Sequence, residues 1–239
     1  VLDTLAGRDL TEPRLSPDGR TVAFVASAPN PVQVVEAHVY TVPVGGGEPV
    51  RVSPWPVRAG RGLGGGCFDW LPDSSGLVIV AKTGELWSVS LSANGAGDAF
   101  RLVTPEPGKS LAAPCVSPDG DGIVMTHDQA QVFVYRLDGT VLRVDNGDHH
   151  FVADPAWWNG RPVWQAWSAP HMPWDESSLV GISGEAGADG SMVRVLGGAP
   201  GLQIQQPRTD STCQRLGWVD DSSGWLNVTV VDGDTGSIR

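Results

Sequence analysis

The sequence predicts an all-β fold built from repeated antiparallel sheets, and three observations lead to that prediction. A tight turn followed by an apolar strand recurs along the chain, centred on Pro17, Pro72, Pro118 and, in a worn form, Asn159, at spacings of about 40 to 55 residues. Glycine and proline are abundant, at 31 and 19 of 239 residues, which favours turns over long helices. The stretches between the copies contain only strand and turn patterns. A unit of this length, made of strands and turns, is typical of a β-propeller.

The turn motif is clearest between Leu15 and Arg20. Pro17 presets φ for a turn, the Asp18 side chain can bond back to the backbone, and Gly19 tolerates a positive φ. The apolar, β-branched run from Val22 to Ala26 then suits a buried strand. We therefore expect Pro17, Pro72 and Pro118 to occupy equivalent turns, each joining the first and second strands of a unit.

Each unit contains the pattern of a four-stranded blade, except that the last has no fourth strand before Arg239. The sequence thus predicts a single, incomplete β-propeller domain over residues 1–239, built of four-stranded antiparallel blades, with four complete blades and a partial fifth. The blades are expected at approximately residues 11–53, 64–105, 111–146, 152–198 and 205–239.

Composition excludes several function classes. The formal charge of −11 disfavours nucleic-acid binding, because a phosphate backbone needs basic patches. No run of 18 apolar residues is present, so no membrane span is expected, and no signal peptide is visible. The chain starts at Val1 rather than Met, so we treat it as a fragment or a processed form, with a cytoplasmic location expected. Three widely spaced cysteines predict reduced core thiols rather than a disulfide framework or a zinc site.

No catalytic motif can be found in the chain. No serine has glycine at both −2 and +2, and Ser183, which comes nearest, follows a strand without a helix after it. There is no P-loop, HExxH or strand-linked GxGxxG. His149 and His150 could bind a metal, but adjacent strand residues face opposite ways, so we expect a polar loop. The prediction is a chain with no catalytic residues, no metal and no cofactor.

The fourth unit contains an irregular insertion, Ser168–Glu176, between its second and third strands. Five of the ten tryptophans lie in or near it, and we expect Trp157, Trp164 and Trp167 to pack between blades. The candidate residues for substrate access or domain docking are Trp174, Asp175 and Glu176, because an exposed aromatic ring beside carboxylates could accept the amino terminus of a peptide. The alternative is that Trp174 folds back onto the blade and the acids cap a turn. The other acidic pair, Asp220–Asp221, is expected to be solvated.

Two stretches resemble a known family. Both are similar to the propeller of the prolyl oligopeptidase family of serine peptidases. The first is Trp164–Trp167 followed by Met172-Pro173-Trp174-Asp175, and the second is Ser222–Asn227 after a strand that starts with Gln-Pro. Within that family, the two stretches resemble most the branch of dipeptidyl aminopeptidases and acylaminoacyl peptidases. The Leu15–Arg20 motif is shared with TolB-like propellers. Trp158-Asn159-Gly160 and Thr209–Thr212 depart from the usual turn.

The resemblance implies a propeller of typically seven blades followed by an α/β-hydrolase domain that carries the catalytic Ser, Asp and His. None of those three residues can be assigned to this chain. The expected function is therefore the non-catalytic propeller part of a serine exopeptidase, whose peptide substrate is hydrolysed in a domain outside this sequence.

Two other functions stay open from the residues alone. One is a TolB-like propeller that binds protein partners. The other is a self-contained propeller enzyme such as a lactonase or glycosidase, which needs converging acids, amides or histidines, usually with a metal; no such repeated set is visible. Homo-oligomerisation also stays open. The gene sequence beyond Arg239 distinguishes a peptidase from an interaction propeller.

Overall fold

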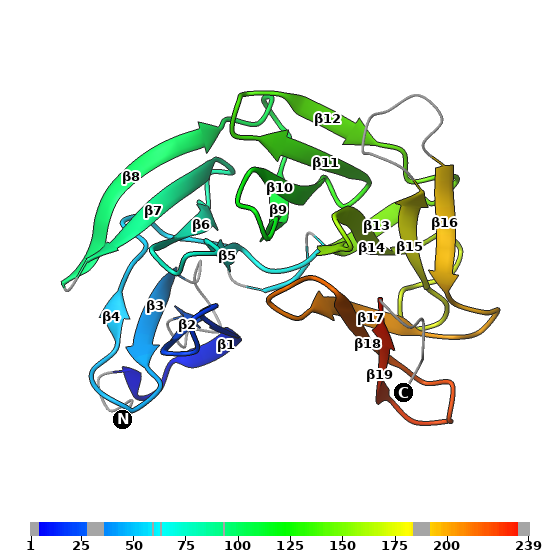
Figure 1. Ribbon diagram of the computed structural model, residues 1–239, viewed down its shortest axis with the longest axis horizontal. Coiled ribbons are helices and arrows are strands. Elements are labelled where there is room, and N and C mark those ends of the chain that lie inside the picture. The colour runs from blue at the N-terminus through cyan, green and yellow to red at the C-terminus, as the bar shows by residue number, and fades with distance from the viewer. Residues whose placement is uncertain are drawn as a thin grey trace. The chain divides into compact units, whose positions relative to one another are not determined.

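The computed structural model describes residues 5–27, 36–58, 60–62, 64–92, 94–183 and 192–233. Within these ranges the chain forms nineteen strands, arranged in five antiparallel sheets of consecutive strands (Figure 1). The prediction of an all-β fold with five antiparallel blades is confirmed. The chain divides into two compact units, the first with residues 1–62 and 66–114, the second with residues 63–65 and 115–239.

The first unit contains sheets one and two, each a four-stranded meander. Their strands are β1 (Asp9–Leu15), β2 (Thr21–Ser27), β3 (Ala37–Pro43) and β4 (Val50–Arg51), then β5 (Phe68–Trp70), β6 (Gly76–Val80), β7 (Leu86–Ser92) and β8 (Gly95–Val103).

The second unit contains sheets three to five, apart from the beginning of β9, where the division falls. Sheets three and four have four strands, and sheet five has three within the described residues. The strands are β9 (Leu111–Val116), β10 (Gly122–His127), β11 (Gln131–Arg136) and β12 (Val141–Val144), then β13 (Phe151–Trp158), β14 (Arg161–Trp167), β15 (Ser178–Ser183) and β16 (Met192–Gly197), then β17 (Ile204–Thr209), β18 (Arg215–Asp220) and β19 (Asn227–Asp232).

The three proline turns occupy the expected positions, between β1 and β2, β5 and β6, and β9 and β10. In two of them a serine hydroxyl closes the turn: Ser16 Oγ accepts the Thr21 amide at 3.0 Å, and Ser117 Oγ accepts the Gly122 amide at 2.9 Å. In sheet five Asp210 takes this role, because its Oδ1 accepts the Arg215 amide at 3.1 Å. A carboxylate therefore replaces the serine hydroxyl where the sequence departs from the motif.

Sheet four has a shorter turn at the same place. β13 and β14 are joined by Asn159 and Gly160 alone, which have φ of 47° and 71°. Positive φ at both central residues defines a tight hairpin that Asn-Gly pairs favour. The departure from the usual motif thus changes the turn type and leaves the strand order intact.

A further repeat lies on the first strands. Glu12, Ala113, Asp154 and Gln206 all have positive φ, between 47° and 55°, and each precedes a proline. The strand register shifts at three of these positions, in β1, β13 and β17. Left-handed backbone at a residue with a side chain costs roughly 1–3 kcal/mol. Because the conformation recurs at the same place in several sheets despite this cost, we regard a bulge on the first strand as a regular feature of these blades.

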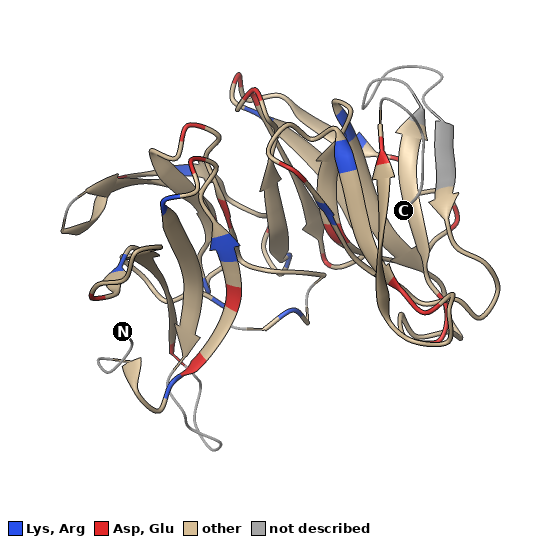
Figure 2. Ribbon diagram, turned by 60° about the horizontal axis from the view of Figure 1, so that its bottom comes forward, with Lys and Arg blue, Asp and Glu red and all other residues tan. Residues whose placement is uncertain are grey.

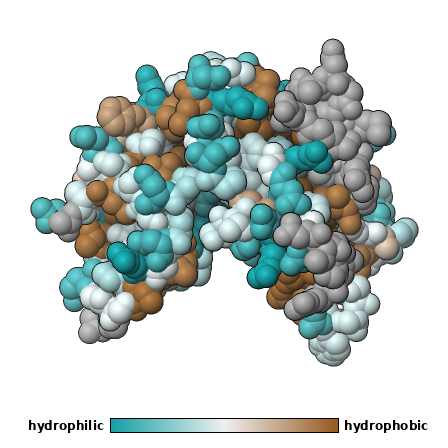
Figure 3. Space-filling view, viewed as in Figure 1, coloured by the Kyte–Doolittle hydropathy of each residue, from teal (hydrophilic) through white to brown (hydrophobic). Residues whose placement is uncertain are grey.

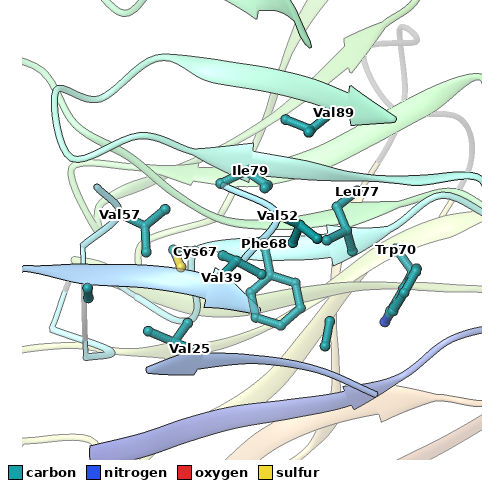
Figure 4. Close-up of a cluster of buried hydrophobic side chains, with 12 residues drawn as sticks. Val25, Val39, Val52, Val57, Cys67, Phe68, Trp70, Leu77, Ile79 and Val89 are labelled. Carbon is teal, nitrogen blue, oxygen red and sulfur yellow. The ribbon is translucent and has the colours of Figure 1, made fainter. Parts of the chain in front are cut away.

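The core of the first unit lies between sheets one and two (Figure 4). Val25 and Val39 from sheet one pack with Phe68, Leu77 and Ile79 from sheet two, all with no exposed surface. Burying such a side chain contributes roughly 1.5–3 kcal/mol each. This shared core, rather than any single sheet, stabilises the unit.

Tryptophan indoles join neighbouring sheets within each unit. Trp70 Nε1 donates to the Arg14 carbonyl at 3.0 Å, and Trp157 Nε1 donates to the Cys115 carbonyl at 3.0 Å. Trp164 has no exposed surface and packs in a cluster with Val124 of sheet three. Packing between blades is therefore confirmed for Trp157 and Trp164.

Trp167 is also buried, but its ring stacks on Phe151 of its own sheet, with ring centroids 5.4 Å apart. All three cysteines are thiols, as expected, and burial raises the pKa of Cys67. In the part of the chain that the structure describes, no helix is long and apolar enough to cross a membrane.

Candidate functional site

The irregular insertion forms a loop over residues 168–177, between β14 and β15. The corresponding connections in sheets two and three, residues 81–85 and 128–130, are shorter. Two backbone bonds from Met172 shape the loop: its carbonyl accepts the amides of Asp175 at 2.9 Å and of Glu176 at 3.1 Å. A tight turn therefore presents Trp174.

Both candidate acids bond to backbone amides. Asp175 Oδ2 accepts the Met172 amide at 3.1 Å, within the turn. Glu176 Oε2 accepts the Gly201 amide at 2.8 Å, in the connection between β16 and β17. The acids hold the loop in shape, while the remaining lone pairs of each carboxylate can still accept a hydrogen bond from a ligand.

Trp174 does not fold back onto the blade. Its side chain is 60% exposed, and Met172 beside it is 44% exposed. Large apolar side chains that remain in water on a well-bonded loop are typical of contact sites. The structure thus brings the three candidate residues into one turn, with the acids bonded to the backbone and the ring projecting into solvent.

Ser177 ties the end of the loop to sheet five. The hydroxyl is buried; it accepts the Ile204 amide at 2.9 Å and lies 2.7 Å from the Ile204 carbonyl oxygen. The Ser177 amide donates to the Leu202 carbonyl at 2.9 Å. The loop is therefore fixed to the first strand of the following blade as well as to its own sheet.

The start of the loop is bonded to the segment before β13. The Ala169 amide donates to His150 Nδ1 at 3.3 Å, and the His150 amide donates to Ser168 Oγ at 3.2 Å. His149 is half-buried, and burial lowers its pKa, which favours the neutral imidazole. Within the described ranges, no group of three or more His, Cys, Asp or Glu residues is placed to hold a metal ion.

The expectation for Asp220 was wrong. This carboxylate is buried, and its Oδ2 accepts Trp218 Nε1 at 2.8 Å and Thr229 Oγ1 at 2.7 Å. Burial alone would raise the pKa of Asp220, but hydrogen bonds from Ser222, Thr229 and Trp218 outweigh it and lower the pKa. Leu216, Trp218 and Asp220 occupy every second position of β18 and share its buried face. This two-residue period was the signal in the sequence that could have predicted the burial of Asp220.

Sequence patterns also missed a serine–histidine–glutamate arrangement in sheet one. Ser53 Oγ lies 3.1 Å from His38 Nδ1, and Glu36 Oε1 lies 3.2 Å from His38 Nε2. Ser53 is only 1% exposed, and its hydroxyl also accepts the Val39 amide at 3.0 Å. A nucleophile must reach its substrate, so the buried Ser53 and His38 join β3 to the segment after β4 rather than forming an active site, while the Glu36 side chain is exposed.

Ser183, the serine nearest to a nucleophile motif, is the last residue of β15. Its side chain and the residues that follow it, 184–191, lie outside the described part of the chain.

Comparison with known proteins places these features in context. No family model matches the chain. The Bacillus subtilis protein named Uncharacterized peptidase YuxL is 27% identical over 152 residues, which cover 62% of this chain and 21% of that protein.

Several solved structures share the fold, among them those of a peptidase and of a TolB protein. A puromycin-hydrolyzing peptidase of Mycobacterium tuberculosis has a TM-score of 0.72 and 20% identity, covering 97% of this chain and 37% of that one. TolB from Acinetobacter baumannii has a TM-score of 0.63 and 14% identity, covering 97% of this chain and 56% of that one.

These matches confirm the resemblance to peptidase propellers that the Met172–Asp175 motif indicated, and the likeness to TolB propellers as well. The chain spans about a fifth of the curated peptidase and less than two fifths of the solved peptidase.

Proposed function

We propose that this chain is the non-catalytic propeller portion of a serine exopeptidase and shapes substrate access to a hydrolase domain elsewhere in the same protein. The observation that carries the proposal is the match of 152 residues to a bacterial peptidase. The exposed Trp174 loop, formed by the motif that resembles the family, supports it.

The proposed domain organisation is one incomplete propeller over residues 1–239. Its blades span approximately residues 11–53, 64–105, 111–146, 152–198 and 205–239, the first four complete and the fifth partial. The three-stranded sheet five supports the last point within the described residues. The hydrolase domain supplies the catalytic residues and acts on a peptide substrate.

Within this function we assign Trp174, Asp175 and Glu176 to substrate access or domain docking. A peptide amino terminus can bond to the carboxylates while its first side chain packs on the indole ring. Hydrogen bonds to a charged group contribute roughly 1.5–3 kcal/mol each, so a free amino terminus should be preferred over a blocked one.

We also propose that the protein acts in the cytoplasm, binds neither nucleic acid nor a membrane, and needs no cofactor. This proposal rests on the acidic charge of −11 and on thiol cysteines.

A second function, protein binding by a TolB-like propeller, is favoured by one observation: the likeness to TolB extends over 97% of the chain. The two functions differ in what the rest of the protein does.

Sequencing the gene beyond codon 239 is the first test, and a GxSxG motif in a strand–turn–helix context is expected. The second is an assay of the purified 239-residue chain on aminoacyl and acyl-aminoacyl chromogenic substrates, which should show no turnover. Turnover that survives removal of contaminating hydrolases would contradict the proposal, and a gene that ends without a hydrolase domain would favour the interaction propeller.

A further inference from the structure

We propose that Trp225, together with Trp174, forms a single binding surface for an extended peptide that carries large apolar side chains and a positive charge. This inference rests on the proposed peptidase function for its substrate class. It adds a second anchor residue, on the blade next to the Trp174 loop.

Three connections at one end of sheets four and five are bonded into one surface: residues 168–177, 198–203 and 221–226. The middle connection joins the other two. Glu176 accepts the Gly201 amide at 2.8 Å from one side, and Asp221 Oδ1 accepts the Gln203 amide at 2.9 Å from the other. In an antiparallel meander, the connections from second to third strand and from one sheet to the next lie at the same end. The loops of Trp174 and Trp225 are therefore parts of one bonded framework.

Among the residues that the structure describes, Trp225 is the most exposed of the large apolar ones, at 81%, and it begins an apolar stretch with Leu226 at 55% and Val228 at 69%. On the face viewed in Figure 3, apolar residues form separate patches among hydrophilic ones. Three such side chains within four residues are a concentration that soluble surfaces seldom carry without a partner.

The backbone that carries Trp225 is fixed by local bonds. Asn227 Nδ2 donates to Ser223 Oγ at 2.6 Å and to the Trp225 carbonyl at 3.1 Å, and the Gly224 amide donates to the Asp221 carbonyl at 2.8 Å. Since the turn is already ordered, binding a ligand to the indole requires little further loss of backbone entropy.

The charge of this surface identifies its occupant. The three connections contain Asp175, Glu176 and Asp221 but no lysine or arginine, and Figure 2 shows acidic residues in the loops of this unit. The whole chain has a formal charge of −11. A second copy would bring like charges together, whereas a peptide with a free amino terminus or basic side chains is attracted.

The rings decide which peptides bind. Indole faces favour aromatic and large aliphatic partners, and the connection between the two loops begins with the small residues Gly198-Ala199-Pro200-Gly201, which leave room for a peptide backbone. Trp174 and Trp225 are therefore specificity-determining residues for apolar side chains, while the acids favour the positive charge.

The test measures binding to the protein as its gene encodes it, by fluorescence polarisation, with a covalent serine-hydrolase inhibitor present so that the proposed peptidase leaves the probe intact. The probe is a hexapeptide with a free amino terminus, two phenylalanines and a dye on a carboxy-terminal lysine; a second probe has serine in place of both phenylalanines. Wild-type protein should bind the phenylalanine peptide at least roughly fivefold more tightly. Trp225→Ala should weaken that binding roughly 3- to 10-fold and leave the serine peptide unchanged, and Trp225→Phe should retain most of it.

Phe100→Ala is the matched control, because Phe100 is an aromatic residue 66% exposed on β8, outside the three connections. The proposal is overturned if Trp225→Ala binds the phenylalanine peptide as wild type does, or if Trp225→Ala and Phe100→Ala weaken that binding equally. It is also overturned if the wild-type protein binds the two peptides equally well. Since binding needs no catalysis, a protein without a hydrolase domain would refute the peptidase function while leaving this test intact.

Discussion

At one end of sheets one, three and five the first strand turns directly into the second through a short segment closed by the side chain of Ser16, Ser117 or Asp210. At the opposite end of sheets four and five, longer connections carry Trp174 and Trp225 into solvent. The first kind of connection recurs with the same bond in three of the five sheets, whereas the two tryptophan connections differ from each other in length and sequence.

The difference separates folding from recognition. In the recurring turn, the amide of the sixth residue donates to the side-chain oxygen of the first, and this bond serves the hairpin that the turn closes. A connection that differs in length and presents exposed indoles serves no hairpin in that way. Substitutions at the two ends should therefore have opposite signatures, with stability affected at one end and ligand binding at the other.

The largest effect on stability is expected for Gly76→Ala, at the first residue of β6. A Cβ there would lie 2.4 Å from the Val89 carbonyl oxygen, and backbone cannot move away cheaply. We expect the free energy of unfolding to fall by about 2–3 kcal/mol, as measured by urea unfolding. Gly62→Ala is the control, since a Cβ at Gly62 meets no atom within 4 Å; equal losses in the two variants would contradict the account.

A smaller loss is expected for Asp220→Asn in sheet five. The amide loses the charge-assisted bonds from Trp218 and Thr229, which should lower the free energy of unfolding by about 1–3 kcal/mol. Because folding lowers the pKa of Asp220 below its ordinary value of 3.8, its contribution is complete above that pH and is lost as the pH falls through the folded-state pKa.

Urea unfolding at a series of pH values tests both parts of this prediction. Wild-type protein should lose stability below about pH 3.8 more steeply than Asp220→Asn, and the exposed Asp121→Asn should behave like wild type. Parallel pH profiles for wild type and Asp220→Asn would show that the buried carboxylate has no such role.

The parts of the fold that could be predicted from the sequence are those determined by residues close together in the chain. The turns at Pro17, Pro72 and Pro118 could be located because their chemistry lies within a few residues, and the strands follow from the apolar runs after them. The Trp174 loop could be singled out because it interrupts that regular pattern.

What sequence did not predict depends on residues far apart in the chain. Asp220 was expected in solvent because its bond to Thr229 across the hairpin cannot be seen from an acidic pair. Glu176 reaches Gly201, and Ser53 reaches His38, only after the strands have paired. Trp225 lies in a motif that resembles the peptidase family, but its exposure and its link to the Trp174 loop required the coordinates.

The most direct test of the central claim is kinetic, in the full-length protein that contains this chain. Trp174→Ala and Asp175→Ala are made separately, and kcat/KM is measured on matched peptide substrates with free and blocked amino termini. The account predicts that both variants lower kcat/KM for the free-amino substrate and reduce its advantage over the blocked one, while Phe100→Ala changes neither. If both variants leave kcat/KM unchanged for the two substrates and only lower the Tm, the loop is structural and the account is wrong.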